Sequence, residues 1–549
     1  MAQGEPGTTQ AEAGRAPRSG VAAFFVGFGI FLSRIAGLVR DRVLATYFGT
    51  GPYADVFAAG LRLPNVLQNM LGEGTLSAAF IPAYSALLGQ GRTQEAGRVA
   101  GAMFALLLAA AGAIVLIGFP LAPLLVTVFA PGFTGERHDL LIVVVRIMFP
   151  MTGLLVLSAW ALGILNSHRR FFLPYFAPVL WNAAIIGALV AFGSRLAPAE
   201  LVVAAAWGAL LGGVLQFGIQ LPTVLRLERE LKFNLGRNEP AFREAVRKTG
   251  PAIMGRGVVQ VSGYLDLVLA SLLAVGAVAR LRYAQTLYLL PVSLFAMSVA
   301  AAALPELARE SEGALHALLE RTVAAVRRVA FYVVPSFVAF IAIGDVLVAG
   351  LYQSGEFGAD DVRVVWFILI AYSLGLLAST TTRVYQSAFF ALRDTATPAR
   401  AAVVRVVIAA VAGAVLMVQF EPISLLGVDI RAGALAELSA AGHPLGPLGL
   451  AGAAALGAWI EWIWLRRRLG AVLGAVGLGF GLGARMLAAA LVAAAAARGV
   501  DSWLAVQSPL LTGVLVAAVF GVVYLGSARL LGLDEARALI GGVLRRVRR

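Results

Sequence analysis

The chain of 549 residues contains no cysteine and only four histidines. The absence of cysteine excludes disulfides, thiolate catalysis and cysteine-ligated metal sites. The histidines lie far apart, without the spacing of metal ligands, at His138, His168, His316 and His443. Walker A, HExxH and GxSxG motifs are also absent. Their absence argues against ATP coupling, zinc metalloprotease chemistry and serine hydrolase chemistry within this chain.

Charged residues are scarce as well. They make up 13% of the chain, against about 25% in soluble domains, while 60% of residues are hydrophobic. The mean hydropathy is +0.84. Apolar runs of the roughly 20 residues that cross a bilayer recur from end to end. The sequence therefore predicts an all-α polytopic membrane protein, because a transmembrane β-barrel would show shorter segments of alternating polarity.

Hydropathy and loop charge predict about 14 transmembrane helices with both termini in the cytoplasm. Basic residues exceed acidic ones, 44 to 30, and concentrate in alternate connections and in the C-terminal tail, as cytoplasmic loops do. The predicted spans are 20–48, 54–89, 98–129, 139–166, 172–194, 200–225, 242–275, 279–308, 317–350, 363–392, 397–419, 444–466, 476–498 and 507–533.

The chain also repeats itself. Phe80-Ile81-Pro82 resembles Ala303-Leu304-Pro305, and residues 166–174 resemble residues 390–398, an offset near 224 (390 − 166). Six spans per repeat is an even number, so the two repeats have the same orientation. This predicts two six-helix lobes plus two C-terminal helices. The segments are a disordered cytoplasmic tail (1–18), an N-lobe (19–225), a cytoplasmic linker (226–241), a C-lobe (242–466), spans 13 and 14 (467–533) and a basic cytoplasmic tail (534–549).

Charged residues inside the apolar runs concentrate in the first two spans of each repeat. Charge in hydrocarbon is costly and usually faces a bundle interior or a water-filled substrate path. On the second span, Asp55, Arg62, Asn69 and Glu73 fall within about 40° of one another at 100° per residue. The simplest geometry places these spans around one cavity with excess positive charge.

Arginine binds phosphate groups in a bidentate manner, so a cationic cavity suits an anionic substrate. Internal salt bridges or caps at helix ends remain an alternative, above all for Arg42, Asp55 and Arg282 near span ends. Gly37 and Pro64 are candidate positions for helix bending or gating. The candidate substrate-binding residues are Arg34, Arg40, Asp41, Asp55, Arg62, Glu73, Arg256 and Arg282.

Several motifs make a family resemblance specific. The segments Ser33–Asp41, Leu63-Pro64-Asn65, Glu73-Gly74, Ala79–Pro82 and Ala130–Phe133 resemble the MurJ (MviN) family of lipid II flippases in the MOP exporter superfamily. The resemblance implies fourteen helices in two lobes, and a groove formed by the last two spans that holds the polyprenyl tail. It also implies functional weight for Arg34, Arg40, Asp41, Asp55 and Glu73, and a basic residue at the position of Arg62.

The chain departs from the family pattern at two positions. Gln68 and Thr286 stand where family members often carry arginines thought to engage the pyrophosphate, and Arg256, Arg280 and Arg282 are nearby candidates to compensate. The resemblance also implies a possible sodium site at Asp266, although Ala401–Val418 offers no Asn or Asp to complete it.

The resulting hypothesis is a monomeric flippase, and not an enzyme. It would carry lipid II, the undecaprenyl-pyrophosphate-linked peptidoglycan precursor, from the inner to the outer leaflet of the bacterial cytoplasmic membrane by alternating access. Apart from sodium no cofactor is expected, and no nucleic acid partner. The alternatives are an exporter of another undecaprenyl-linked oligosaccharide or of a drug, a membrane-embedded glycosyltransferase, and a structural partner in cell-wall assembly.

Overall fold

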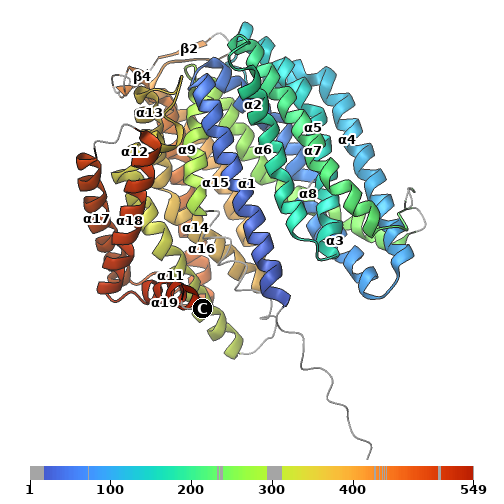
Figure 1. Cartoon of the computed structure of the whole chain (residues 1–549). Coiled ribbons are helices and arrows are strands. Elements are labelled where there is room, and N and C mark those ends of the chain that lie inside the picture. The colour runs from blue at the N-terminus through green and yellow to red at the C-terminus, as the bar shows by residue number, and fades with distance from the viewer. Residues whose placement is uncertain are drawn as a thin grey trace, which may run out of the picture.

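The computed structural model describes residues 18–71, 73–231, 234, 236, 239–292, 312–425, 428–431, 433, 435, 437, 439–440, 442–504 and 508–547. Of the predicted N-terminal tail, only Arg18 belongs to the described residues. The described chain is dominated by long helices, which confirms the predicted all-α class (Figure 1).

The first half of the chain forms the helices of the predicted N-lobe. They are α1 (Arg18–Phe48), α2 (Pro52–Leu71), α3 (Glu73–Gly89), α4 (Thr93–Phe129), α5 (Glu136–Ser167), α6 (Phe172–Phe192) and α7 (Pro198–Leu227).

The second half continues with the predicted C-lobe and the C-terminal helices. They are α8 (Pro240–Ser271), α9 (Ala277–Pro291), α11 (Glu312–Ala342), α12 (Gly344–Tyr352), α13 (Ala359–Ser373), α14 (Leu376–Ala391), α15 (Ala396–Phe420), α16 (Gly446–Leu473), α17 (Phe480–Trp503), α18 (Pro509–Leu530) and α19 (Asp534–Val547).

The predicted spans coincide with single helices or with consecutive helix pairs. The tenth predicted span, for example, is the pair α13 and α14, whose axes differ by 41°. Among the described residues, nine helices are long and apolar enough to cross a membrane, or ten if this bent pair is one span. The second part of the eighth predicted span, from residue 293, lies outside the described residues.

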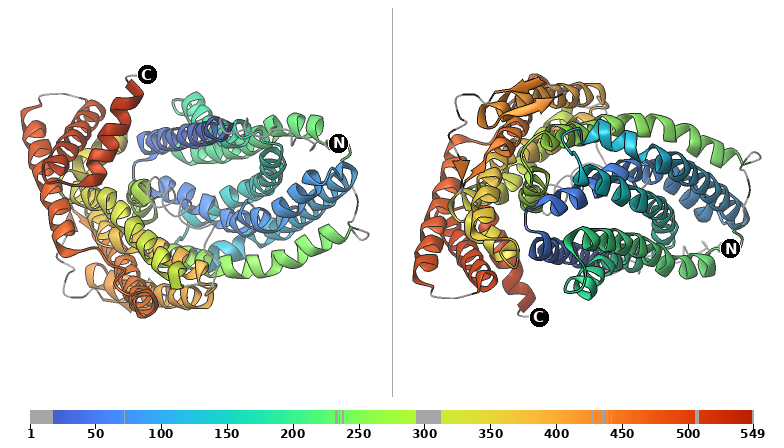
Figure 2. Two further views of the ribbon diagram at one scale, coloured as in Figure 1. Left: turned by 90° about the horizontal axis from the view of Figure 1, so that it is seen from below. Right: turned by 90° about the horizontal axis from the view of Figure 1, so that it is seen from above.

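Most helices of the two halves form two groups, while α8 packs against α3 of the first half as well as against α15. The helix α6 packs against α1 and α7, and α5 packs against α2, α4 and α7. In the second group α16 packs against α13, α14 and α15, while α17 packs against α18 at the edge. Views along the bundle show the first group on one side and the second group, followed by α17 and α18, on the other (Figure 2).

Small residues bring α6 and α7 together. Gly208 and Gly212 lie four residues apart on α7 and face α6. A Cβ atom at Gly212 would lie 2.8 Å from the Cα atom of Trp181, and one at Gly208 would lie 2.8 Å from the Cβ atom of Ala188. Such spacing of small residues lets helix backbones approach closely in membranes, where the hydrophobic effect does not drive association. The contact also positions Trp181, whose ring lies under the guanidinium of Arg40.

Backbone geometry supports the internal repeat. Arg169 and Arg393, which are 224 positions apart, both have left-handed φ angles, 59° and 60°. The hydrogen bonds around them also match, since Arg170 N–H donates to Leu165 and Asp394 N–H donates to Phe389. Helices commonly end with a left-handed residue, usually glycine, so an arginine in this conformation at both places is distinctive.

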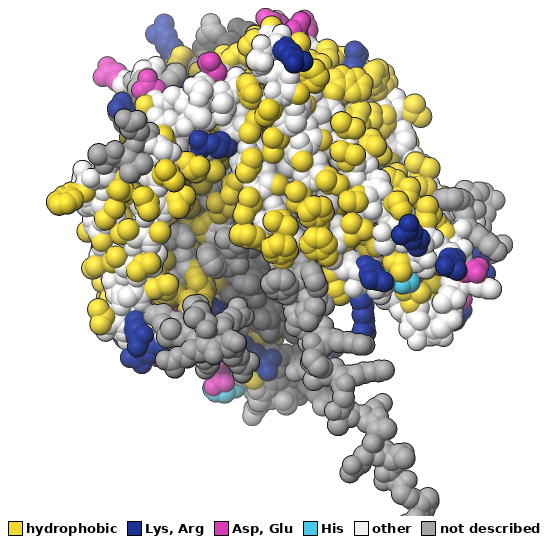
Figure 3. All heavy atoms as spheres, in the orientation of Figure 1, with side chains coloured by type: hydrophobic (Ala, Val, Ile, Leu, Met, Phe, Trp, Pro, Cys, Tyr) yellow, Lys and Arg dark blue, Asp and Glu magenta, His cyan; other side chains and the backbone are white. Residues whose placement is uncertain are grey.

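The surface has the pattern of a membrane protein. A broad band of hydrophobic side chains covers the visible face, and most charged side chains lie towards the two ends of the molecule (Figure 3). The helix α1 begins, and α18 ends, at the same end of the bundle, as an even number of crossings requires (Figure 1). We call the opposite end, with residues 49–51, 130–135 and 353–358, the outer end, because loop charge predicts it to be external.

Two features were not predicted from the sequence. Between α15 and α16 the chain forms two short antiparallel hairpins, from β1 (Ile423–Leu425) and β2 (Val428–Ile430) and from β3 (Ser439–Ala440) and β4 (His443–Pro444). The predicted basic tail begins with the helix α19, whose Asp534 and Glu535 form ion pairs with Arg327 of α11.

Candidate substrate site between the lobes

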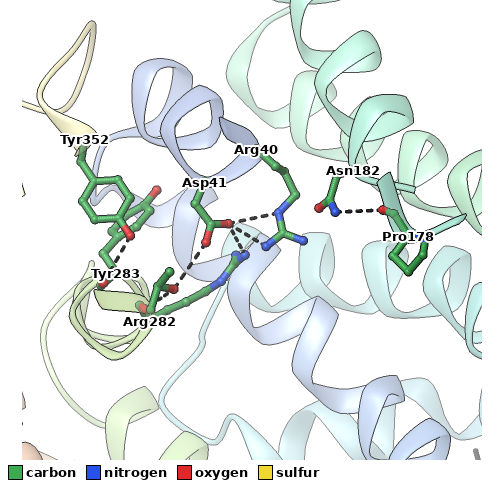
Figure 4. A network of polar contacts seen from close by, with 8 residues as sticks. Arg40, Asp41, Pro178, Asn182, Arg282, Tyr283 and Tyr352 are labelled. Atoms are coloured by element: carbon green, nitrogen blue, oxygen red, sulfur yellow. Dashed lines mark hydrogen bonds and ion pairs between the residues drawn. The ribbon is translucent and has the colours of Figure 1, made fainter. Parts of the chain in front are cut away.

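The carboxylate of Asp41 on α1 is the centre of a polar cluster. Its Oδ1 atom lies 2.8 Å from Nη2 of Arg40 and 2.8 Å from Nη2 of Arg282 on α9, and Thr286 Oγ1 lies 3.4 Å from its Oδ2 atom (Figure 4). Only 4% of the Asp41 side chain is exposed. The cluster therefore joins the first span of the N-lobe to the second span of the C-lobe, as the sequence predicted for these helices.

The Asp41 cluster has a net positive charge, because it contains two arginines and one carboxylate. One carboxylate balances one guanidinium, and each guanidinium has five N–H donors. Arg40 lies over the ring of Trp181, 5.1 Å from its centroid, and Arg282 lies 5.9 Å from the ring centroid of Phe57. These aromatic faces favour the cations without using their N–H groups. The arrangement can accept a second anion, which phosphate oxygens would satisfy in bidentate geometry.

A second charged contact joins the lobes on the neighbouring helices. Nη2 of Arg62 on α2 lies 3.5 Å from Oδ2 of Asp266 on α8. The side chains are 31% and 43% exposed, so this pair is open to solvent. Next to it, the hydroxyl of Tyr264 donates to the carbonyl oxygen of Leu63 at 3.0 Å. The structure thus places both predicted residues, Arg62 and Asp266, between the lobes.

Arg34 lies seven residues before Asp41 on α1, which at 100° per residue is about 20° away on the same face. Its side chain is exposed, and its role in substrate binding stays a prediction. Among the described residues it forms no hydrogen bond or ion pair. A Cβ atom at Gly37 on the same stretch would meet no atom within 4 Å, so Gly37 does not provide close packing here.

Asp55 has the structural role, a cap at a helix end, that was left open as an alternative for it. It is 1% exposed and accepts hydrogen bonds from the backbone N–H groups of Gly276 and Ala279, at 2.7 and 2.8 Å. It therefore satisfies donors at the start of α9, where helix N–H groups lack partners within the helix. Arg137 lies 3.5 Å from it. In this structure Asp55 is an interlobe helix cap at the outer end, and its binding of substrate stays a prediction.

The turn before α9 requires a glycine for this contact. Gly276 has a φ angle of 94°, in the left-handed region, and its Cα faces the backbone oxygen of Thr50. Arg280, one turn later, is 3% exposed and donates from Nε to Thr50 Oγ1 at 3.1 Å. Arg280 therefore stabilises the same interlobe contact and is not a spare cation for substrate.

Further hydrogen bonds close the lobes at the outer end. The N–H of Glu356 donates to the carbonyl of Thr46 at 2.9 Å, and Thr46 Oγ1 lies 2.7 Å from Ser354 Oγ. Arg42, for which a structural role was an open alternative, donates to the carbonyl oxygens of Gly350 and Leu351 at 2.8 and 3.0 Å. We call these bonds, with those of Asp55 and Arg280, the outer contact.

The structure does not describe the side chains of some predicted site residues. The side chains of Gln68, Glu73 and Arg256 lie outside the described residues. Pro64 is buried within α2, which continues through it. Because proline has no N–H, the helix loses one hydrogen bond there, and its role in bending stays a prediction.

One charged cluster within the C-lobe was not predicted from the sequence. Glu461 on α16 is 1% exposed and accepts hydrogen bonds from Gln386 Nε2 at 3.0 Å and from Arg405 Nη1 at 3.1 Å. The rule that selected Arg34, charge inside an apolar run, applies equally to Arg405 in 397–419 and to Glu461 in 444–466. Applying it to every span would have found both residues.

The carboxylate of Asp266, where sodium binding was expected, pairs with Arg62. Sodium binding at Asp266 stays a prediction. Among the described residues, no group of three or more His, Asp and Glu side chains could hold a metal ion.

Comparison with known proteins assigns the family. Residues 44–524 match the family model described as lipid II flippase MurJ. A lipid II flippase MurJ from Burkholderia cenocepacia is 32% identical over 383 residues, covering 68% of this chain and 73% of that protein. A probable lipid II flippase MurJ from Rhizobium tropici is 32% identical over 375 residues, covering 67% and 70%.

Solved structures show the same fold. A lipid II flippase MurJ in an inward closed conformation matches with a TM-score of 0.73 and 22% identity, covering 93% of this chain and 99% of that one. An inward-facing multidrug resistance MATE family transporter of the MOP superfamily matches with a TM-score of 0.61 and 18% identity, covering 82% and 98%. With the family model matching most of the sequence, the chain belongs to the MurJ family of lipid II flippases.

Proposed function

We propose that this transporter moves lipid II from the inner to the outer leaflet, with the headgroup passing between the lobes while the polyprenyl tail stays in lipid. The observation that carries the proposal is the Asp41 cluster, a buried contact between the lobes that holds more positive than negative charge.

The charge of the described interlobe residues suits a pyrophosphate. At the Asp41 cluster and the Arg62–Asp266 pair, three arginines and two aspartates give a sum of +1 (3 − 2), and exposed Arg34 on the same face of α1 as Asp41 adds one more positive charge. A pyrophosphate diester carries one negative charge on each phosphate. In a partly desolvated site, attraction between opposite unit charges 4 Å apart is worth roughly 4 kcal/mol at an effective dielectric of 20. A cationic drug would be repelled by the same residues, which disfavours the drug-exporter alternative.

The tail would remain outside the helices. Exposed apolar side chains on α17 and α18 include Leu491, Val492, Val514 and Val522. They support the idea that this edge of the molecule faces acyl chains. Burying apolar tail surface against such residues contributes about 25 cal/mol per Å² only where water is displaced, so in lipid the helices guide the tail more than they bind it.

The cycle follows from the closed outer contact. The lobes would rock apart at the outer end and together at the inner end, which exposes the arginines to the other leaflet. Membrane potential or an ion gradient would drive this step. Localisation in the bacterial inner membrane, cytoplasmic termini and a monomeric state belong to the same proposal, and the basic connections at 90–97, 167–171 and 226–241 support the orientation.

The proposal is tested by complementation of a bacterium depleted of its lipid II flippase, with lipid II measured on the outer leaflet. The wild-type chain should restore export, and Arg34→Ala should lose most of it while inserting normally. Arg195→Ala removes another exposed arginine, in the loop before α7, and should export at the wild-type rate. Failure of the wild-type chain in this assay would contradict the proposed substrate, and full export by Arg34→Ala would remove Arg34 from the site.

A further inference from the structure

The C-lobe holds a second arginine near Asp266 that the transport proposal does not use. Arg405 on α15 is bound to Glu461 at 3.1 Å, while 39% of its side chain is exposed. Asp266 forms a 3.5 Å pair with Arg62 of the other lobe, and its helix α8 packs against α15, which carries Arg405. Asp266 therefore pairs with a cation of the N-lobe and lies on a helix beside the one that carries a second cation.

The ion pair between Asp266 and Arg62 is weak. Both side chains are partly exposed, at 31% and 43%, and the 3.5 Å separation is loose for an ion pair. Exposed pairs of this kind contribute little, because water and salt compete for both charges. The guanidinium of Arg62 lies over Gly263 on α8, where a Cβ atom would be 3.5 Å from Nη2.

Arg405, in contrast, is held in place. Both oxygens of Glu461 have a partner, Oε1 from Gln386 and Oε2 from Arg405. Glu461 is 1% exposed, so loss of Arg405 would leave a buried carboxylate without its cationic partner, which is costly. Since a guanidinium carries five N–H donors, Arg405 can bind a second carboxylate while it keeps Glu461.

We infer that Asp266 acts as an internal substitute for the substrate phosphate: it occupies Arg62 until the pyrophosphate binds there, and then pairs with Arg405. This inference rests on the proposed function, because the competing anion is the pyrophosphate. The exchange spares Asp266 from remaining unpaired between the lobes, and it breaks a link between the lobes when substrate arrives. Substrate binding is thereby coupled to freedom of the lobes to move.

The exchange predicts that removal of the Asp266 charge strengthens pyrophosphate binding. The purified full-length chain in nanodiscs would be titrated with geranylgeranyl pyrophosphate, with geranylgeraniol as the uncharged probe. Asp266→Asn should bind the pyrophosphate roughly two- to fivefold more tightly than wild type, the range expected for release of an exposed ion pair. The double variant Asp266→Asn with Arg62→Gln should lose this gain. Arg405→Gln should bind about twofold more weakly, since Asp266 then stays on Arg62.

Matched controls separate the inference from the proposed function. Asp139→Asn removes an exposed carboxylate at the outer end, 82% exposed, and should leave the affinity unchanged. Asp266→Glu keeps the charge and should bind like wild type, which shows that substitution alone does not disturb the site. Unchanged or weaker pyrophosphate binding by Asp266→Asn, with wild type preferring the pyrophosphate over the alcohol, overturns the exchange alone. If wild type binds both probes equally, the cationic site fails and the exchange fails with it.

Discussion

The two sets of contacts between the lobes differ in burial and in the groups that form them. At the outer contact, Asp55 and Arg280 are 1% and 3% exposed, and most bonds involve backbone N–H or carbonyl groups. Nearer the middle, Arg62 and Asp266 meet through side chains that are 31% and 43% exposed. Backbone bonds require one fixed arrangement of the helices, whereas exposed side chains can exchange partners.

This difference assigns separate roles to the two regions. The outer contact closes the molecule on one side, and the open side chains are available to an anion. The Asp41 cluster belongs to both, because it is buried like the outer contact yet presents excess guanidinium groups as a binding site does. Variants in the three places should therefore differ in the size and kind of their effects.

The largest effect is expected from Asp41→Ala. It leaves Arg40 and Arg282 without their shared carboxylate in a buried place, and breaking a buried ion pair in this way costs about 3–5 kcal/mol. Both thermal stability and lipid II export should fall, measured by melting of the purified protein and by complementation. Asp139→Asn serves as the control at an exposed carboxylate. Wild-type export by Asp41→Ala would show that the cluster is dispensable.

The next effect is expected from Arg282→Gln, which removes one cation and keeps hydrogen-bonding groups. A hydrogen bond to a charged group is worth about 1.5–3 kcal/mol, so export should fall roughly tenfold or more. Thr286→Arg in the same chain should restore part of it, because Thr286 Oγ1 already lies 3.4 Å from Asp41 Oδ2. Complementation at matched expression measures both. No recovery in the double variant would mean that the position of the cation matters and not only its charge.

A smaller and different effect is expected from Asp55→Ala. Loss of a helix cap costs about 1 kcal/mol, which should shift the outer contact towards the open state roughly fivefold. The readout is labelling of a cysteine at buried Ser271 by a membrane-impermeant maleimide, since the chain has no native cysteine. Labelling should rise in Asp55→Ala relative to the parent Ser271→Cys chain. Equal labelling of the two chains would contradict the role of Asp55 in closing the lobes.

The smallest effect is expected at the opposite end of the bundle. Thr397 donates to Asp394 through its backbone N–H at 2.9 Å, and hydrogen bonds from Thr397 hold the pKa of Asp394 below its ordinary value of 3.8. A lowered folded-state pKa stabilises the protein above 3.8 and loses this contribution as pH falls through the lowered value. Asp394→Asn should therefore melt slightly earlier than wild type at neutral pH and equally below this range, with export unchanged. A difference in melting that persists in acid would contradict this assignment.

The fold and the choice of helices at the site could be predicted from the sequence because both depend on local patterns. Hydropathy predicted the spans, and charge inside apolar runs pointed to Arg40, Asp41, Arg62 and Arg282, all of which lie at contacts between the lobes. A capping role was an open alternative for Asp55, but its partners could not be predicted, because Gly276 and Ala279 are 221 and 224 residues away and bind through backbone groups. A sequence does not show which helix end an aspartate will meet.

The central claim is that the outer contact must open for transport. Thr46→Cys with Ser354→Cys tests it most directly, because the two hydroxyl oxygens are 2.7 Å apart and a disulfide needs Cβ atoms about 3.5–4.5 Å apart. The absence of native cysteine leaves no competing thiol in this chain. Oxidation should cross-link the pair and stop lipid II export, reduction should restore it, and each single variant should be insensitive to oxidant. Full export by the cross-linked protein would contradict the account.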